Sequence, residues 1–195
     1  MKFIEDYIYL KSSKYSAKSI SKFLKRINVK INKLEVLDFG CGPCTMHKFL
    51  NFKKVYLYDI NNFTKPKQKN KYVVIKNYNS IFKNKNKYDL IILNSVIQYI
   101  KPNILINLLK SLKKKLKQNG IIFLGDIPKS NRIFEILMSK NLKKIYYLLK
   151  YFLLNRAYYQ TEYYLYKELF FKKKFRKDKI IFFSSNSYFF KGRYC

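Results

Sequence analysis

The stretch Val36–Thr45 reads VLDFGCGPCT, an apolar run that ends in an acid and a glycine-rich turn. A stretch compatible with a helix, Met46–Phe52, follows the turn. A strand that leads through glycines into a helix is typical of sites for nucleotide-like ligands, because glycine lets the backbone approach the ligand and the first helical amides point at it. The sequence therefore predicts a ligand site at this turn.

Two cofactor signatures have residues in common with this turn. DFGCGPC resembles the DxGxGxG signature of class I S-adenosylmethionine (SAM)-dependent methyltransferases. Asp38, Gly40 and Gly42 are in register with that signature, and Cys44 stands at its third glycine. The dinucleotide fingerprint GxGxxG instead puts its third glycine at Thr45 and does not include the acid. The turn therefore favours SAM over a dinucleotide.

Residues 41–44 also spell CGPC, the motif of thioredoxins, and a CxxC near a β-α unit can mark redox chemistry. Thioredoxins have a short loop with an aromatic residue between the strand and the first cysteine, whereas Cys41 directly follows Gly40. Their fold also needs a later cis-proline, and the sequence has none between Pro66 and Pro102. A thioredoxin-like redox protein is therefore the outlying alternative.

A second short apolar run, Val55–Ile60, contains an acid, Asp59, near its end. In nucleotide-binding α/β folds, the carboxylate at the tip of the second strand accepts hydrogen bonds from both ribose hydroxyls. We therefore predict that Asp59 binds the ribose of the cofactor. The adenine is expected to lie against Ile60, with Asn77 near its amino group.

Strands and helical patterns alternate along the rest of the chain, which predicts β-α-β units and a parallel sheet. The N-terminal residues, about Phe3–Ile27, are expected to form a helix pair, while Asn61–Asn70 and Asn79–Lys87 are expected to be polar loops. The other expected elements are strands at Tyr72–Lys76, Tyr88–Asn94, Ile121–Leu124, Lys179–Ser184 and Tyr188–Tyr194, and a helix at Asn103–Lys117 that stops at Asn119-Gly120.

The resemblance to class I methyltransferases continues over about residues 36–126. YDLIILNSVIQY resembles their fourth motif, with Asn94 at the cofactor-facing end of the strand, and LKQNGIIFLGD resembles the helix-turn-strand that follows. GDIP, SVIQY and the late tyrosines are most similar to bacterial small-molecule methyltransferases, some of which are associated with surface-polysaccharide synthesis. The resemblance implies SAM as cofactor, held by Asp38, Gly40, Cys41, Gly42, Asp59, Ile60, Asn77 and Asn94.

The fold that this resemblance implies is α/β, a three-layer α-β-α Rossmann-like arrangement. Its seven-stranded, mostly parallel sheet has an antiparallel last strand that inserts beside the fifth. The length suits one domain over residues 1–195. We expect it to consist of an N-terminal helical segment (1–30), a SAM-binding core (34–127), a helical lid over the substrate (130–170) and the last two strands (178–195).

Several polar residues are expected near the mouth of this sheet, on the acceptor side. Asp126 follows the fifth strand and is a candidate general base, although an aspartate there can also cap a helix. His47, the single histidine, lies just past the cofactor turn and is expected to be a surface or packing residue. No cluster has the spacing of metal ligands, so no metal is predicted. The predicted substrate residues are Gln98, Tyr99, Tyr158 and Tyr159.

The net charge of +31 suggests a nucleic-acid partner, because basic surfaces bind phosphate backbones. Only five of the 42 basic residues are arginine, the side chain that suits bidentate phosphate contacts. The abundance of lysine, asparagine, isoleucine, tyrosine and phenylalanine matches AT-rich codons, which would supply lysine without selection for any partner. An RNA-binding protein or RNA methyltransferase therefore stays the alternative, with Lys172–Lys179 as its best patch.

Three cysteines and no signal peptide indicate a reducing compartment, so we expect a cytoplasmic protein. The basic amphipathic stretch Ile145–Leu154 is too short to span a bilayer and could cover the substrate or rest on a membrane surface. The favoured function is SAM-dependent methyl transfer to a small-molecule or saccharide acceptor, with the oligomeric state left open.

Overall fold

A six-stranded sheet forms the centre of the molecule. The computed structural model describes residues 2–61, 71–125 and 180–182. The sheet order is β3-β2-β1-β4-β5-β6, and every pair of neighbours is parallel. The strands are β1 (Glu35–Phe39), β2 (Lys54–Tyr58), β3 (Tyr72–Val74), β4 (Tyr88–Asn94), β5 (Leu116–Gly125) and β6 (Ile180–Phe182).

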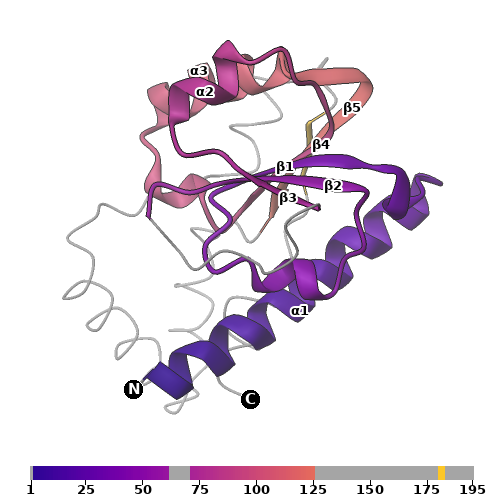
Figure 1. Cartoon of the computed structure of the whole chain (residues 1–195), viewed down its shortest axis with the longest axis vertical. Helices are drawn as coiled ribbons and strands as arrows, with labels where there is room; N and C mark the ends of the chain where they lie inside the picture. The colour runs from indigo at the N-terminus through magenta and orange to yellow at the C-terminus, as the bar shows by residue number, and fades with distance from the viewer. Residues whose placement is uncertain (1, 62–70, 126–179, 183–195) are drawn as a thin grey trace, which may run out of the picture.

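Helices cover both faces of this sheet (Figure 1). The helices α2 (Tyr78–Lys83) and α3 (Pro102–Lys113) lie on one face, and α1 (Lys2–Arg26) crosses the other together with the 3-10 helix η2 (Thr45–Lys48). Each face has its own apolar cluster, so the sheet is buried on both sides. This arrangement confirms the predicted three-layer α-β-α fold.

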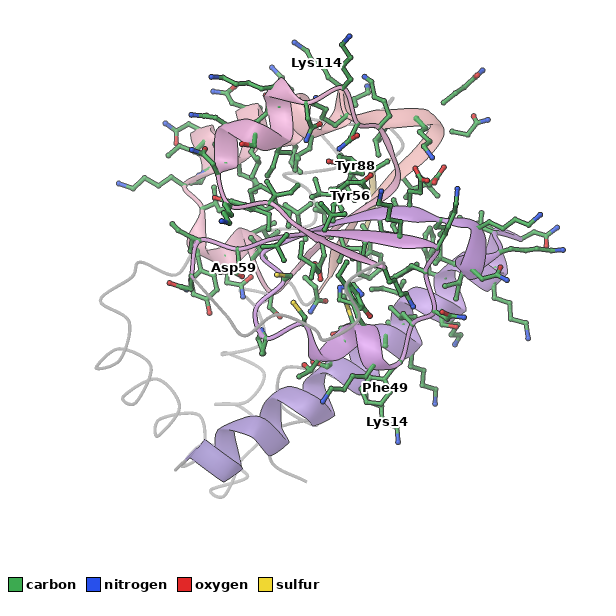
Figure 2. The ribbon with its side chains drawn as sticks, in the orientation of Figure 1. Lys14, Phe49, Tyr56, Asp59, Tyr88 and Lys114 are labelled. Carbon is green, nitrogen blue, oxygen red and sulfur yellow. The ribbon has the colours of Figure 1, made fainter. Side chains whose placement is uncertain are left out.

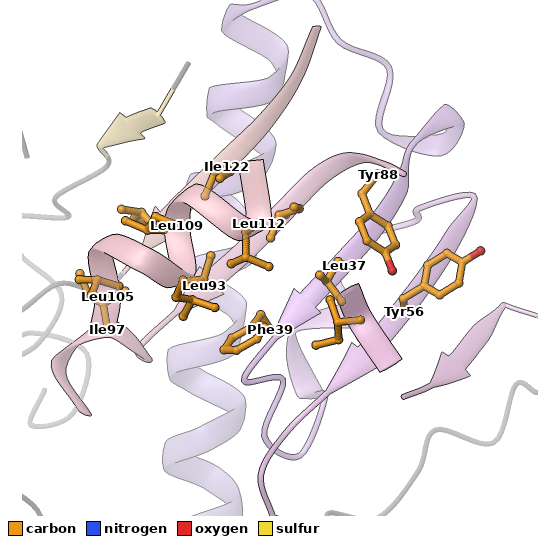
Figure 3. Packing of buried hydrophobic residues seen from close by; sticks show 14 of the residues in the cluster. Leu37, Phe39, Tyr56, Tyr88, Leu93, Ile97, Leu105, Leu109, Leu112 and Ile122 are labelled. Carbon is orange, nitrogen blue, oxygen red and sulfur yellow. The ribbon is translucent and has the colours of Figure 1, made fainter. Parts of the chain in front are cut away.

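The apolar pattern of each element explains the face that it buries. The central strands β1 and β4 are almost continuously buried, as expected for parallel strands covered on both faces. In α3, Leu105, Leu109 and Leu112 form one apolar stripe at helical spacing. Figure 3 shows this stripe turned toward Leu93 and Ile122 of the sheet. Pro102 opens the helix, where its missing N–H costs nothing.

Two predictions about helices on the α1 side are wrong. The N-terminal segment is one continuous helix, α1, rather than a helix pair. The stretch Met46–Phe52 forms no α-helix, because only the four residues of η2 follow the turn and β2 begins at Lys54. Met46, Leu50 and Phe52 are instead buried in the cluster beneath α1.

Most of the helix α2 falls in the stretch Asn79–Lys87, which was predicted to be a polar loop. The Asn77 side chain caps it by accepting from the N–H of Asn79 at 2.8 Å, and Ile81 anchors it in the core. One buried isoleucine is a weak signal in a polar sequence, which is why the pattern alone did not predict this helix.

The expected helix stop at Asn119-Gly120 lies inside β5, because α3 already ends at Lys113. Tyr88 of β4 pairs with Leu116 of β5, whereas Leu90, two residues later, pairs with Ile121. Strand β5 therefore carries extra residues between these two pairs. Asn119 has a φ of +63°, and a Cβ on Gly120 would lie 2.8 Å from the carbonyl oxygen of Tyr88. The Asn-Gly pair thus makes a bulge that lets the two strands approach.

The last strands agree with the predicted fold in part. The strand predicted at Lys179–Ser184 is confirmed as β6, which pairs parallel with β5 over Ile122–Leu124. That position is the one expected for the antiparallel seventh strand, so the expected order at this edge differs. The predicted strand Tyr188–Tyr194 lies outside the described residues.

An ionic cluster ties together the amino ends of β1 and β4. Lys117 Nζ lies 3.0 Å from Glu35 Oε2 and 3.0 Å from Asp89 Oδ2, and Lys53 Nζ lies 3.1 Å from Glu35 Oε1. The backbone N–H of Glu35 also donates to Asp89 at 2.8 Å. The hydrogen bonds from Lys117 and Lys53 hold the pKa of Glu35 below its ordinary value of 4.5.

We expect Lys117→Met to lower the free energy of unfolding by about 1 kcal/mol at neutral pH, since the pairs are partly exposed. A lowered pKa in the folded state adds stability above the unfolded pKa, and this stability disappears as the pH falls through the folded pKa. Urea unfolding of both proteins from pH 7 to pH 3 should therefore show the difference shrinking below about pH 4.5. A difference that stays constant with pH would contradict the assignment to Glu35.

Candidate active site

The candidate site lies where the strand order of the sheet reverses. From β1 the chain proceeds to β2 on one side, whereas β4 lies on the other side of β1. Beyond their turns, the chain segments that follow β1 and β4 therefore cover opposite faces of the sheet, and open α/β sheets bind ligands at such a place, outside the carboxyl ends of the strands. The glycine turn follows β1, and Asn94 and Ser95 stand at the end of β4.

The glycine turn has three residues in the left-handed region: Gly40 at φ +81°, Gly42 at +51° and Cys44 at +57°. A Cβ on Gly40 would lie 2.3 Å from Cγ2 of Val96, so Gly40 lets the turn after β1 pack against the turn after β4. A Cβ on Gly42 would meet nothing within 4 Å. Gly42 thus has open space on the side where a Cβ would stand.

The end of β2 binds the amides of this turn. The N–H groups of Gly40 and Cys41 donate to the carbonyl of Tyr58 at 2.7 and 3.1 Å. The N–H of Gly42 donates to Asp59 Oδ2 at 2.8 Å. The amides of residues 40–42 are therefore bound by the end of β2, and only the four-residue η2 follows the turn in place of the expected α-helix.

Asp59 keeps the capacity that ribose binding requires. Its Oδ2 accepts from Gly42 and its Oδ1 accepts from the N–H of Asn61 at 2.9 Å. A carboxylate offers about four acceptor positions, so two remain for the ribose hydroxyls. The side chain is partly exposed at the carboxyl edge of the sheet, where Figure 2 shows it on the left. The residues present therefore fit the ribose of SAM.

Ile60 and Asn77, the two residues predicted to lie near the adenine, differ in their surroundings. Ile60 is 87% exposed, as a side chain must be if it is to cover a bound ring. Asn77 uses its carbonyl oxygen to cap α2, so its side chain has a structural partner already. Sequence reasoning missed an aromatic cluster here: the rings of Phe39 and Tyr58 are 5.0 Å apart, and that of Tyr78 is 6.0 Å from Tyr58.

Asp38 lies below the turn and is almost completely buried. Its Oδ2 is 2.7 Å from Nε2 of His47, and the two side chains are 3% and 1% exposed. His47 was predicted to be a surface or packing residue; its burial excludes the surface position, and the sequence did not reveal its partner. The sequence shows only that Asp38 and His47 are nine residues apart. Whether residues at that spacing meet depends on the geometry of the turn between them, which the fold defines.

Cys41 and Cys44 are free thiols packed within the turn. The pKa of Cys41 is raised far above its ordinary range by the neighbouring Cys44 thiol, by burial and by the Asp38 carboxylate. Catalytic thiols of redox proteins have a lowered pKa, since the thiolate is the nucleophile. The environment of the CGPC motif therefore opposes redox chemistry.

We expect Cys41 to react with iodoacetamide at pH 8 at least about tenfold more slowly than free cysteine, because little of it is thiolate. Mass spectrometry of the peptide that contains residue 41 measures the rate, and Cys41→Ser identifies the modified position. Rapid alkylation, or reduction of insulin disulfides by the wild-type protein, would contradict this and restore the redox alternative.

The acceptor-side residues Gln98 and Tyr99 belong to the short 3-10 helix η3 (Ile97–Tyr99) after β4. Gln98 is 1% exposed, and its Oε1 has no hydrogen-bond partner in the described part of the chain. Tyr99 is 47% exposed. Asn94 is close to Gly125, since a Cβ on that glycine would lie 2.4 Å from Asn94 Oδ1. The ends of β4 and β5 therefore meet beside η3.

Other predicted residues lie outside the described part of the structure, namely Asp126, Tyr158 and Tyr159, as do the lid (130–170), the stretch Ile145–Leu154 and the patch Lys172–Lys179. Within residues 2–61, 71–125 and 180–182, no three His, Cys, Asp or Glu side chains gather as metal ligands do. None of the helices described is both long and apolar enough to cross a bilayer.

Several solved structures resemble this chain. Magnesium protoporphyrin IX methyltransferase from Synechocystis PCC 6803, solved with bound SAH (S-adenosylhomocysteine), is 19% identical at a TM-score of 0.55, over 84% of this chain and 70% of that one. DesVI of Streptomyces venezuelae is 14% identical at a TM-score of 0.52, over 67% of this chain and 58% of that one. A SAM-dependent methyltransferase from Clostridium acetobutylicum ATCC 824 is 22% identical at 0.49, over 60% of this chain and 51% of that one.

The chain therefore spans about half of the length of the Clostridium protein. No curated protein sequence matches it. A family model described as a methyltransferase domain matches residues 11–166, which is most of the chain. This match confirms the predicted class I methyltransferase and SAM as the cofactor of the family. The chain belongs to the methyltransferase domain family.

Proposed function

We propose that this protein transfers a methyl group from SAM to a small-molecule or saccharide acceptor. The observation that carries the proposal is the contact between the β2 acid and the glycine turn, Gly42 N–H to Asp59 Oδ2 at 2.8 Å, at the reversal of the strand order. An acid held at the mouth of an open glycine turn suits a ligand that carries a ribose diol.

The residues around this contact would each bind one part of the cofactor. Asp59 accepts from the ribose hydroxyls, Ile60 covers the adenine, and the open side of Gly42 borders the remainder. Asp38 acts from beneath the turn, where it is almost fully buried, and the half-buried Cys41 is part of the turn itself. When bound, SAM supplies an electrophilic methyl group on a sulfonium that is already a good leaving group.

The protein's own task is then to align the acceptor and to accept its proton if the acceptor is a hydroxyl. Gln98 and Tyr99 stand at the end of β4, on the acceptor side of the proposed cofactor position. We propose Asp126, which directly follows β5, as the general base and Tyr158 and Tyr159 as walls of the acceptor pocket. Aromatic walls with few polar groups suit a sugar or a small amphipathic molecule.

The acceptor class is supported by the name of one protein of similar fold. The Synechocystis enzyme of similar fold is named for magnesium protoporphyrin IX, a small molecule. The charge of +31 remains the argument for RNA, but it is carried by lysines rather than by arginines.

Two measurements test the proposal. Titration calorimetry of the full chain with SAH should show binding to one site, and absence of binding to the folded protein would refute the cofactor. Transfer of radiolabelled methyl groups should then be compared between a panel of sugars and small hydroxylated molecules and total RNA. Labelling of RNA that persists at physiological salt would overturn the small-molecule acceptor, because nonspecific binding by lysines weakens steeply with salt.

A further inference from the structure

The glycine turn lacks the support that a following helix provides. In an α-helix the backbone ladder fixes the first turn, whereas here only η2, four residues long, follows Cys44. Cys44 itself is left-handed, at φ +57°, a conformation that costs a non-glycine residue free energy. Tyr58 and Asp59 bind the amides of Gly40, Cys41 and Gly42, so the part of the turn beyond Gly42 must be held by other contacts.

Side chains from two elements take that role at η2. Ser13 of α1 hydrogen-bonds Thr45 through their hydroxyls. Asp38, at the end of β1, binds His47 at 2.7 Å. The second bond joins the residue that enters the turn to a residue just beyond it, so the backbone between them is closed into a ring.

Burying the polar pair Asp38 and His47 costs free energy, so a role for the pair is to be expected. Both side chains are almost fully buried, and removing a carboxylate from water requires compensation by its partner. An ionised carboxylate only accepts, so beside the ionised form of Asp38 the Nε2 of His47 carries the shared hydrogen. Nδ1 is buried and finds no partner among the described residues. An apolar residue would pack beside Phe52 and Tyr72 without that penalty, so packing does not account for a histidine here.

We propose that His47 is a positioning residue for the cofactor, acting through Asp38. The histidine holds the Asp38 carboxylate below the turn and fixes the backbone from Gly40 to Cys44, so that Gly42 can donate to Asp59 while its other side stays open. This inference rests on the proposed function, since it concerns the affinity for SAM and SAH.

The test compares His47→Leu with His47→Gln, whose amide N–H can replace the Nε2 donor. At a temperature well below unfolding, His47→Leu should weaken SAH binding by about tenfold, as expected for loss of one coupled positioning contact. His47→Gln should recover most of that loss. In a double-mutant cycle, adding His47→Leu to Asp38→Asn should change the affinity less than about twofold, because the two residues act as a unit.

The matched control is Phe52→Leu, a buried residue whose ring centroid is 5.9 Å from that of His47. It should lower the melting temperature as His47→Leu does and leave the SAH affinity unchanged. If His47→Leu lowers the melting temperature but leaves the SAH affinity unchanged, as expected for Phe52→Leu, His47 is a packing residue and the inference is wrong. The same conclusion follows if the effects in the double-mutant cycle are additive.

A measurement without cofactor separates this outcome from failure of the proposed function. Hydrogen exchange of the Gly40 and Gly42 amides in the free protein should speed up in His47→Leu by about tenfold, because local opening of the turn exposes them. The exchange should be unchanged in Phe52→Leu. Unchanged exchange in both variants would overturn the inference even if wild type binds no SAH, whereas missing SAH binding with faster exchange would refute only the cofactor.

Discussion

Asp59→Ala is expected to weaken SAH binding by about 100-fold, the largest effect on affinity that we expect from one substitution. Two hydrogen bonds to a charged acceptor contribute about 3 kcal/mol together, since each is stronger than a neutral pair. The substitution also removes the acceptor of the Gly42 N–H, which now lies 2.8 Å from the carboxylate. The turn therefore loses a partner in the free protein as well.

Two variants separate these contributions in calorimetric titrations with SAH. Asp59→Asn keeps one carbonyl oxygen for the Gly42 N–H but loses the charge and the second acceptor, so its affinity should lie between those of wild type and Asp59→Ala. Glu35→Ala removes a carboxylate at the amino end of the sheet, where it binds Lys53 and Lys117, and should change stability without changing SAH affinity. An SAH affinity of Asp59→Ala within about threefold of wild type, less than one such hydrogen bond contributes, would show that Asp59 does not bind the ribose.

Gly40→Ala is expected to lower the free energy of unfolding by about 2–4 kcal/mol, the largest loss of stability among these variants. The φ of Gly40 is +81°, which strains any residue that carries a Cβ. The new Cβ would also lie 2.3 Å from Cγ2 of Val96. Valine is stiff at χ1 and cannot easily rotate away, so the turns after β1 and β4 must separate.

Gly42→Ala is the matched control, because its φ is +51° but a Cβ would meet nothing within 4 Å. It should cost only about 1 kcal/mol of stability, the backbone term alone. Its methyl group would instead project into the open space beside the turn. The loss in free energy of SAH binding should therefore exceed the loss in free energy of unfolding.

Adding Val96→Ala to Gly40→Ala should recover part of the lost stability, since the clash is with that side chain. Urea unfolding of the four proteins measures these differences. Equal losses for Gly40→Ala and Gly42→Ala, or no recovery with Val96→Ala, would show that the contact between the two turns is not what requires glycine at position 40.

The sequence predicted the strands well and the helices less well, for a physical reason. Strands buried on both faces are unbroken apolar runs, and Tyr88–Asn94 was predicted with its observed bounds. The helix α2 buries Ile81 as its anchor in an otherwise polar stretch, so its pattern is indistinct. The Asn-Gly pair at 119–120 suits a helix stop and a bulge equally, and only pairing with Tyr88 decides between them.

For the candidate site, the sequence by itself determined which residues could hold a nucleotide-like cofactor. The acid and glycines of the turn and the acid after β2 follow from chemistry and spacing along the chain. The tertiary structure decided their partners: Tyr58 and Asp59 bind the turn amides, Val96 requires Gly40, and His47 binds Asp38. These contacts join residues on different elements, and their distances depend on how the strands align and how the turns pack, which local sequence does not encode.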